Sequence, residues 1–111
     1  MEKLTIGSVV LVAFPFSNLK GKKIRPALIL ANVEFDNLIL CQITSKPYSS
    51  KTAIQIESTD FAVGGLPVIS YVRPDKLFTA DSDIIERVSG KLSITVTRNI
   101  LTKVRGLFST T

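Results

Sequence analysis

Short apolar runs rich in Val, Ile and Leu recur along the chain, and they limit the folds that it can adopt. Each run is shorter than a typical buried helix and has the β-branched content that strands favour. Gly, Pro, Asn and Ser residues separate one run from the next, as expected for turns. The runs predicted as strands are Val9–Phe14, Ala27–Ala31, Leu38–Ile43, Ala53–Ile56, Val68–Val72 and Ile84–Val88.

Several of these runs lack a clean alternation of apolar and polar residues, which indicates strands covered on both faces. After the last run, Ser93 is a suitable N-cap, and apolar residues follow it at helical spacing. They are Ile100, Leu101, Val104, Leu107 and Phe108. The sequence therefore predicts a mainly β, small α+β fold, with an antiparallel barrel of roughly five to seven strands and a C-terminal helix at Ile94–Leu107. At 111 residues, the chain has room for one domain, 1–111.

The chain is basic, with 14 Lys and Arg residues against nine Asp and Glu, a net charge of +5. Such a charge favours a polyanionic partner, whether nucleic acid, an acidic protein or a membrane surface. The single cysteine, Cys41, cannot form an internal disulfide, which fits a reducing compartment. Glu2 lies where a signal peptide carries positive charge, and no apolar run is long enough to cross a bilayer. We therefore expect a soluble cytoplasmic protein with no membrane partner.

The absence of histidine restricts the chemistry of the chain. It excludes Ser-His-Asp and Cys-His arrangements, and an RNase mechanism that uses paired histidines. With one cysteine, only carboxylates are left as metal ligands, and these form no metal-binding motif; Asp81 and Asp83, with Asp75, are interpreted as a turn and helix-cap cluster. The glycines lack the spacing of a phosphate-binding loop. We expect no metal and no cofactor.

A basic segment with Lys20, Lys22, Lys23 and Arg25 is predicted as a loop between the first two strands. Functional groups concentrate in such loops, but the same charges also serve solubility alone, and both interpretations stay open. Arg25 precedes Pro26, which restricts the Arg25 backbone to an extended geometry. A guanidinium held there can bind a phosphate through two hydrogen bonds and stabilise charge that develops on it.

Two further segments carry polar groups at predicted strand ends. If Cys41 and Ile43 face the core, Thr44 faces the other side, and Thr44 and Ser45 lie at the barrel rim. Their hydroxyls can contact a phosphoryl oxygen, or they can simply cap a turn; Cys41 is interpreted as a small buried hydrophobe. In the second segment, Arg73 and Lys76 can extend an anion-binding track.

For Arg73, a structural ion pair with Asp75 or Glu86 is an equal alternative.

Five motifs in this order resemble the PemK/MazF toxin family. They are GSVVLVAFPF, KKIRPALIL, LCQITS, ISYVRPDKLFTAD and VSGKLS, the last one before the terminal helix. Each motif alone is weak, but the ordered set extends from residue 7 to about residue 107.

The resemblance implies an SH3-like barrel, a homodimer and a sequence-specific endoribonuclease that acts on single-stranded RNA. It also implies a cognate antitoxin whose acidic C-terminal tail lies across the RNA-binding surface. The catalytic pair of the family corresponds to Arg25 and Thr44, and its gating loop to Pro15–Ile24. The residues expected to bind RNA are Lys20, Lys22, Lys23, Phe16, Ser45, Arg73 and Lys76.

In such enzymes the 2′-hydroxyl of the RNA attacks the adjacent phosphate without a metal, which gives a 2′,3′-cyclic phosphate and a 5′-hydroxyl. Arg25 is expected to act through its charge, because a guanidinium stays protonated in proteins. The chain departs from many members by its Ala13-Phe14-Pro15-Phe16 segment, and it has no Trp. Base stacking therefore falls to Phe16, Phe61 or Tyr48, and Phe14 is assigned to the core.

Two other hypotheses stay open at this point. One is a barrel of the CcdB kind, which poisons DNA gyrase by protein contact and cuts nothing. Against it, the chain ends in Gly106-Leu-Phe-Ser-Thr-Thr111, without an aromatic-ended tail that contacts gyrase. The other is a degenerate member of the PemK/MazF family that only binds its antitoxin or RNA.

Overall fold

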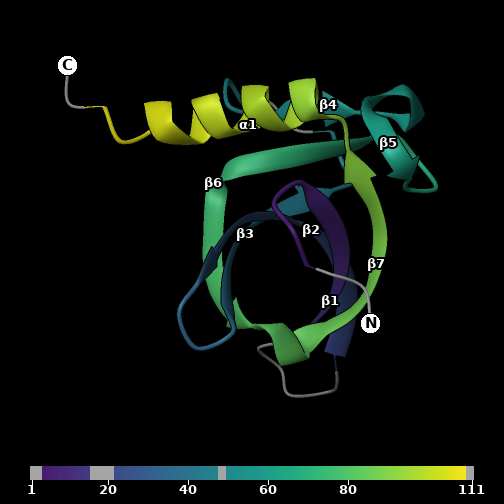
Figure 1. The fold of residues 1–111 in the computed structure, drawn as a ribbon. Helices are drawn as coiled ribbons and strands as arrows, with labels where there is room; N and C mark the ends of the chain where they lie inside the picture. The colour runs from purple at the N-terminus through teal and green to yellow at the C-terminus, as the bar shows by residue number, and fades with distance from the viewer. Residues whose placement is uncertain (1–3, 16–21, 48–49, 110–111) are drawn as a thin grey trace.

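A computed structural model describes residues 4–15, 22–47 and 50–109, and in this part of the chain one curled sheet and one helix make up the fold (Figure 1). The strands are β1 (Ser8–Pro15), β2 (Lys22–Val33), β3 (Asn37–Thr44), β4 (Ile54–Ile56), β5 (Phe61–Gly64), β6 (Ser70–Asp81) and β7 (Ile85–Leu92). Their order in the sheet is β4-β6-β3-β2-β1-β7-β5, and every pairing is antiparallel. The mainly β fold predicted from the sequence, with its C-terminal helix, is confirmed.

Two apolar clusters cover opposite faces of the central strands. One contains Val9, Leu28 and Cys41, and Ile100 of the helix packs into it. The other contains Val10 and Ala27, which are register partners one residue further along β1 and β2. Because neighbouring residues of a strand point to opposite faces, each central strand contributes to both clusters. The sequence interpretation of strands covered on both faces is confirmed.

Strand β6 turns a corner in its middle, which curls the sheet into a half-barrel (Figure 1). Cys41 of β3 pairs with Leu77, while the next residue, Gln42, pairs with Arg73. Residues 74–76 therefore have no partner on β3 and form a bulge. Pro74 is buried in this bulge, where its missing N–H removes no ladder hydrogen bond, and a bulge of this kind bends the strand.

The helix α1 (Ile94–Gly106) lies along the outer side of the first half of β6 (Figure 1). Ser93 is its N-cap, and the Ser93 hydroxyl accepts a hydrogen bond from the backbone N–H of Val96. Ile100 is fully buried. The predicted helix and cap are confirmed, but Phe108 lies beyond the helix and is 68% exposed, so its assignment to the apolar helix face was wrong.

The strand boundaries differ from the prediction in several places. Strand β2 begins at Lys22, so Lys22–Arg25 is strand and not loop, because its backbone pairs with Val12–Pro15 of β1. Strand β6 begins at Ser70, two residues after the predicted Val68, and runs to Asp81, well past the predicted Val72. Strand β5 was not predicted, and β7 extends beyond Val88 to Leu92. In each case cross-strand pairing overrides a polar or glycine-containing sequence.

No helix in the described residues is long and apolar enough to cross a membrane.

Gly90 is a close-contact position between β5 and β7. A Cβ atom on Gly90 would lie 2.6 Å from the carbonyl oxygen of Val63 and 2.7 Å from the amide nitrogen of Gly65. Both are backbone atoms, so neither can rotate away as a side chain would. We expect Gly90→Ala to lower the free energy of unfolding by about 1–3 kcal/mol.

The matched control is Gly106→Ala at the end of α1, where an added Cβ meets no atom within 4 Å. This substitution is expected to raise the free energy of unfolding by about 0.5–1 kcal/mol, since Ala has the higher helix propensity. Urea denaturation of the two variants measures both effects. Equal stability of the two variants would contradict the close contact at Gly90.

Candidate active site

Arg25 and Thr44 lie at facing positions near the ends of β2 and β3. The pairing of these strands stops at Ala27 and Gln42, next to Pro26, which has no N–H to donate. Two residues further along each strand are Arg25 and Thr44, so both project from the same face as the Ala27–Gln42 pair. The register thus places the arginine and the hydroxyl opposite each other, where the two strands cease to pair.

Both residues line a cavity of about 410 Å³ at this point, here called the cation-lined cavity. Its charged lining residues are all cations, contributed by β2, by the end of β3 and by β7: Lys23, Arg25, Lys46 and Arg87. Leu11, Ile24, Pro26 and Ile43 contribute apolar surface. No carboxylate is present among the described residues that line it. Such a cavity attracts an anion with an apolar or aromatic portion.

The Thr44 hydroxyl is oriented by the turn that follows β3. Its Oγ1 accepts a hydrogen bond of 3.1 Å from the backbone N–H of Lys46. The turn-capping role weighed from the sequence is therefore present. A hydroxyl that accepts one hydrogen bond still has its own proton to donate, so the cap orients Thr44 and leaves it able to donate to a phosphoryl oxygen.

The far wall of the cation-lined cavity is the segment Leu66–Val68. Two serine hydroxyls fix its ends. Ser89 Oγ donates to the carbonyl oxygen of Gly65 at 2.6 Å, and the buried Ser70 Oγ donates to the carbonyl oxygen of Val68 at 3.0 Å. The wall is therefore attached to β6 and β7, which favours a preformed cavity.

Of the residues predicted to bind RNA, Lys23 and Ser45 line this cavity, whereas Arg73 and Lys76 of β6 do not. Lys22 belongs to β2, and its side chain lies outside the described residues. Phe16, Lys20 and the proposed stacking residue Tyr48 also lie outside them.

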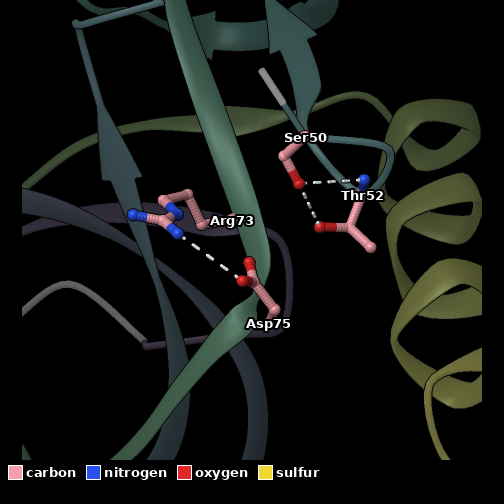
Figure 2. Close-up of polar contacts among 4 residues, drawn as sticks. All are labelled: Ser50, Thr52, Arg73 and Asp75. Carbon is pink, nitrogen blue, oxygen red and sulfur yellow. Dashed lines mark hydrogen bonds and ion pairs between the residues drawn. The ribbon is translucent and has the colours of Figure 1, made fainter. Parts of the chain in front are cut away.

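Arg73 forms an ion pair with Asp75, with 3.5 Å between Nη2 and Oδ2 (Figure 2). The geometry thus matches the structural bridge weighed from the sequence. Asp75 lies in the bulge of β6 and does not belong to the turn and cap cluster to which it was assigned, which corrects that interpretation. Asp81 does cap a turn, because its Oδ1 accepts from the backbone N–H of Asp83.

Figure 2 also shows Ser50 and Thr52 in the turn before β4. The backbone N–H of Thr52 donates to Ser50 Oγ at 3.2 Å, and the two hydroxyl oxygens are 2.9 Å apart. This pair stabilises the turn and stands apart from the Arg73–Asp75 ion pair.

Sequence reasoning missed four polar residues of the cavity, Lys46, Ser70, Arg87 and Ser89. Lys46 directly follows the Thr44-Ser45 pair, which was a usable local signal. Arg87 and Ser89 reach the site only because β7 lies beside β1 in the sheet. No local pattern in the sequence reveals that neighbourhood.

The thiol of Cys41 is buried and is held in its protonated, unreactive form. Burial raises its pKa to about 12 from an ordinary 9.0, and the negative charge of Asp75 adds to the shift. Cys41 is fully buried, which confirms it as a small hydrophobic core residue. In the described part of the chain, no group of three His, Cys, Asp or Glu residues is placed to hold a metal ion.

Comparison with known proteins decides the family. Residues 5–108 match the family described as PemK-like, MazF-like toxin of type II toxin-antitoxin system. The chain belongs to this family. The resemblance seen in the five motifs is thereby confirmed over nearly the whole chain. A search among curated proteins gave no match.

Solved structures of PemK/MazF toxins share the fold. The MazF crystal structure from Deinococcus radiodurans has a TM-score of 0.73 at 18% identity, over 96% of this chain and 97% of that one. A MazE-MazF crystal structure from the same organism has a TM-score of 0.72 at 20% identity, over 95% of this chain and 96% of that one. An endoribonuclease in complex with its cognate antitoxin, from a Mycobacterial species, has a TM-score of 0.67 at 16% identity, over 96% of this chain and 93% of that one. At these identities the likeness concerns the fold.

The reactivity of Cys41 tests the packing next to the site. We expect the native protein to resist a thiol reagent at pH 8 and to react at the one-thiol level once urea unfolds it. The unfolded thiol ionises near pH 9 and the folded one near 12. The stability that depends on the protonated Cys41 thiol is therefore complete below pH 9. It is lost as the pH rises from 9 to 12, because the thiol ionises in the unfolded chain and not in the folded one. Rapid labelling of the native protein would contradict this burial.

Proposed function

We propose that this member of the PemK/MazF family is an endoribonuclease toxin that cleaves single-stranded RNA without a metal ion. The observation that carries the proposal is the facing arrangement of Arg25 and Thr44 in a cavity whose charged lining residues are all cations. An RNA chain carries an anionic phosphate between nucleosides with aromatic bases, and the cavity combines cations with apolar surface. Membership of the toxin family supports the same activity.

The substrate supplies the nucleophile in this mechanism. The 2′-oxygen of one nucleotide forms a bond to the adjacent phosphorus, and the bond from phosphorus to the 5′-oxygen of the next nucleotide breaks. The 2′-hydroxyl loses a proton and the leaving 5′-oxygen gains one. The products are a 2′,3′-cyclic phosphate and a 5′-hydroxyl, and no step needs histidine, which the chain lacks.

Arg25 and Thr44 act on the charge of the phosphorane. The Arg25 guanidinium donates to its non-bridging oxygens and stabilises the extra negative charge that develops on them. The Thr44 hydroxyl, which accepts a hydrogen bond from the backbone N–H of Lys46, donates a hydrogen bond to one of the same oxygens. Lys23 and Ser45 at the cavity bind the neighbouring phosphate groups, with Lys20, Lys22, Phe16, Arg73 and Lys76 as further RNA-binding residues.

The proposal includes protein partners. A cognate antitoxin with an acidic C-terminal tail suits the same cations, because its carboxylates compete with RNA phosphates for them. The chain, acting as one domain over 1–111 in the cytoplasm, forms a homodimer. Exposed apolar residues at the cavity, Ile24 at 49% and Val68 at 56% in its lining and the neighbouring Ile69 at 48%, support a contact at its rim.

Cleavage of a long single-stranded RNA in EDTA tests this function. We expect the wild-type protein to cut, because the mechanism uses no metal. Arg25→Ala and Thr44→Ala are each expected to lower kcat by about 10²–10³, the cost of removing one donor that stabilises an oxyanion. Thr44→Ser should retain most of the activity because it keeps the hydroxyl. Product analysis should find the cyclic phosphate.

Arg105→Ala, on an exposed turn of α1, is the control for loss of one positive charge and should cut normally. Intact RNA with the wild-type protein would exclude the ribonuclease function. The hypotheses that remain are then the gyrase poison, which an assay of DNA gyrase activity tests, and the family member that only binds. Cleavage that requires magnesium would contradict the metal-free mechanism. Unchanged kcat in Arg25→Ala would exclude Arg25 from catalysis.

A further inference from the structure

Arg87 of β7 lines two cavities of opposite charge. One is the cation-lined cavity. The other, of about 1020 Å³, lies where the β2–β3 turn meets the short turn of residues 82–84, and is here called the acidic cavity. Both turns lie at the end of the barrel that is lowest in Figure 1, away from α1.

The charged residues that line the acidic cavity are mostly carboxylates, whereas those that line the cation-lined cavity are all cations. Asp36, Asp83 and Glu86 line it, and Arg87 is its single cation among the described residues. Glu34 belongs to the first of these turns, and Asp81 directly precedes the second. On β7, the change of sign falls between two consecutive residues, since Glu86 lines only the acidic cavity and Arg87 lines both.

The register places Arg87 across β1 from Pro26, the residue after Arg25. Leu11 of β1 pairs with Pro26 on one side and with Arg87 on the other. Pro26 and Arg87 are therefore two strand spacings apart, about 10 Å, and Arg25 is next to Pro26. Arg25 and Arg87 both line the cation-lined cavity, so a ligand there meets Arg25 from β2 and Arg87 from β7. Within the described residues the only ion pair is Arg73–Asp75, so Arg87 is not engaged in one.

We infer that Arg87 binds the last phosphate of the RNA track, and that Asp83 and Glu86 repel the phosphate beyond it. The inference rests on the proposed function and names one phosphate position and the boundary of the site. Exposed charges within about 10 Å act on each other at 0.1 M salt. A polyanion that follows the cations therefore gains binding free energy from the phosphate at Arg87. The next phosphate lies near Asp83 and Glu86 and loses binding free energy by repulsion. The charge boundary on β7 limits the length of RNA that the protein contacts.

Binding of single-stranded DNA oligonucleotides tests the role of Arg87 apart from catalysis, because DNA has no 2′-hydroxyl and is not cut. Arg87→Gln is expected to reduce the slope of log K against log salt concentration by about 0.7, the loss of one phosphate contact on a single strand. With RNA, the same variant should raise KM by about tenfold at unchanged kcat, the pattern of a lost binding contact. Arg105→Gln removes the same charge on α1 and should change neither quantity.

The boundary is tested with oligonucleotides of increasing length. For the wild-type protein, affinity should rise with length and then stop rising. The double variant Asp83→Asn with Glu86→Gln should continue to gain affinity with nucleotides added beyond that length. Asn99→Lys with Thr102→Lys adds the same net charge on exposed positions of α1 and should leave the limiting length unchanged.

The outcomes separate this inference from the proposed function. If the wild-type protein neither binds the oligonucleotides nor cuts RNA, the proposed function fails, and this inference fails with it. If it does both, but Arg87→Gln keeps the wild-type salt slope and KM, Arg87 binds no phosphate and the inference alone is overturned. A limiting length that shifts equally in both charge variants would show a general effect of net charge and would refute the boundary.

Discussion

The packing of Ala27–Leu30 against apolar clusters on both faces of the sheet positions the candidate active site. A strand buried on both sides can neither rotate nor slip, because a slip of one residue would exchange its two faces. The residues just before it, Lys23–Pro26, are therefore held in place by the core although they are themselves polar or partly exposed. Pro26 ends the pairing with β3, and the opening that results is where Arg25 and Thr44 face each other.

Charge is distributed unevenly over this frame. Cations surround the cavity at the start of β2 and the end of β3, and carboxylates gather around the turns at residues 34–36 and 82–84. The net charge of +5 describes neither region. The separation gives the molecule a direction along which a polyanion is first attracted and then repelled. It also keeps the acidic residues away from Arg25, whose positive charge the proposed chemistry uses.

The sequence was informative wherever local pattern and tertiary context agree. The apolar runs predicted the central strands, and Ser93 predicted the start of α1, because burial and capping leave local signatures. Pairing of distant segments leaves none. Lys22–Arg25 appears as a polar loop in sequence but continues β2, and β6 passes through Arg73-Pro74-Asp75, a segment that by itself suggests a turn. Arg87 was missed for the same reason, since only the sheet order brings β7 to the cavity.

The sheet curls without closing, so β4 and β5 remain as its two edges. An edge strand exposes N–H and C=O groups with which another chain can pair, and long flat edges promote aggregation. Here the edges have three and four residues, whereas β2 and β6, with twelve residues each, lie inside the sheet. Strand β4 pairs with β6 only at Ser70–Val72, so it is short both as a neighbour and as an edge. Because β4 and β5 carry few unpaired N–H and C=O groups, another chain that pairs with either edge gains only a few backbone hydrogen bonds.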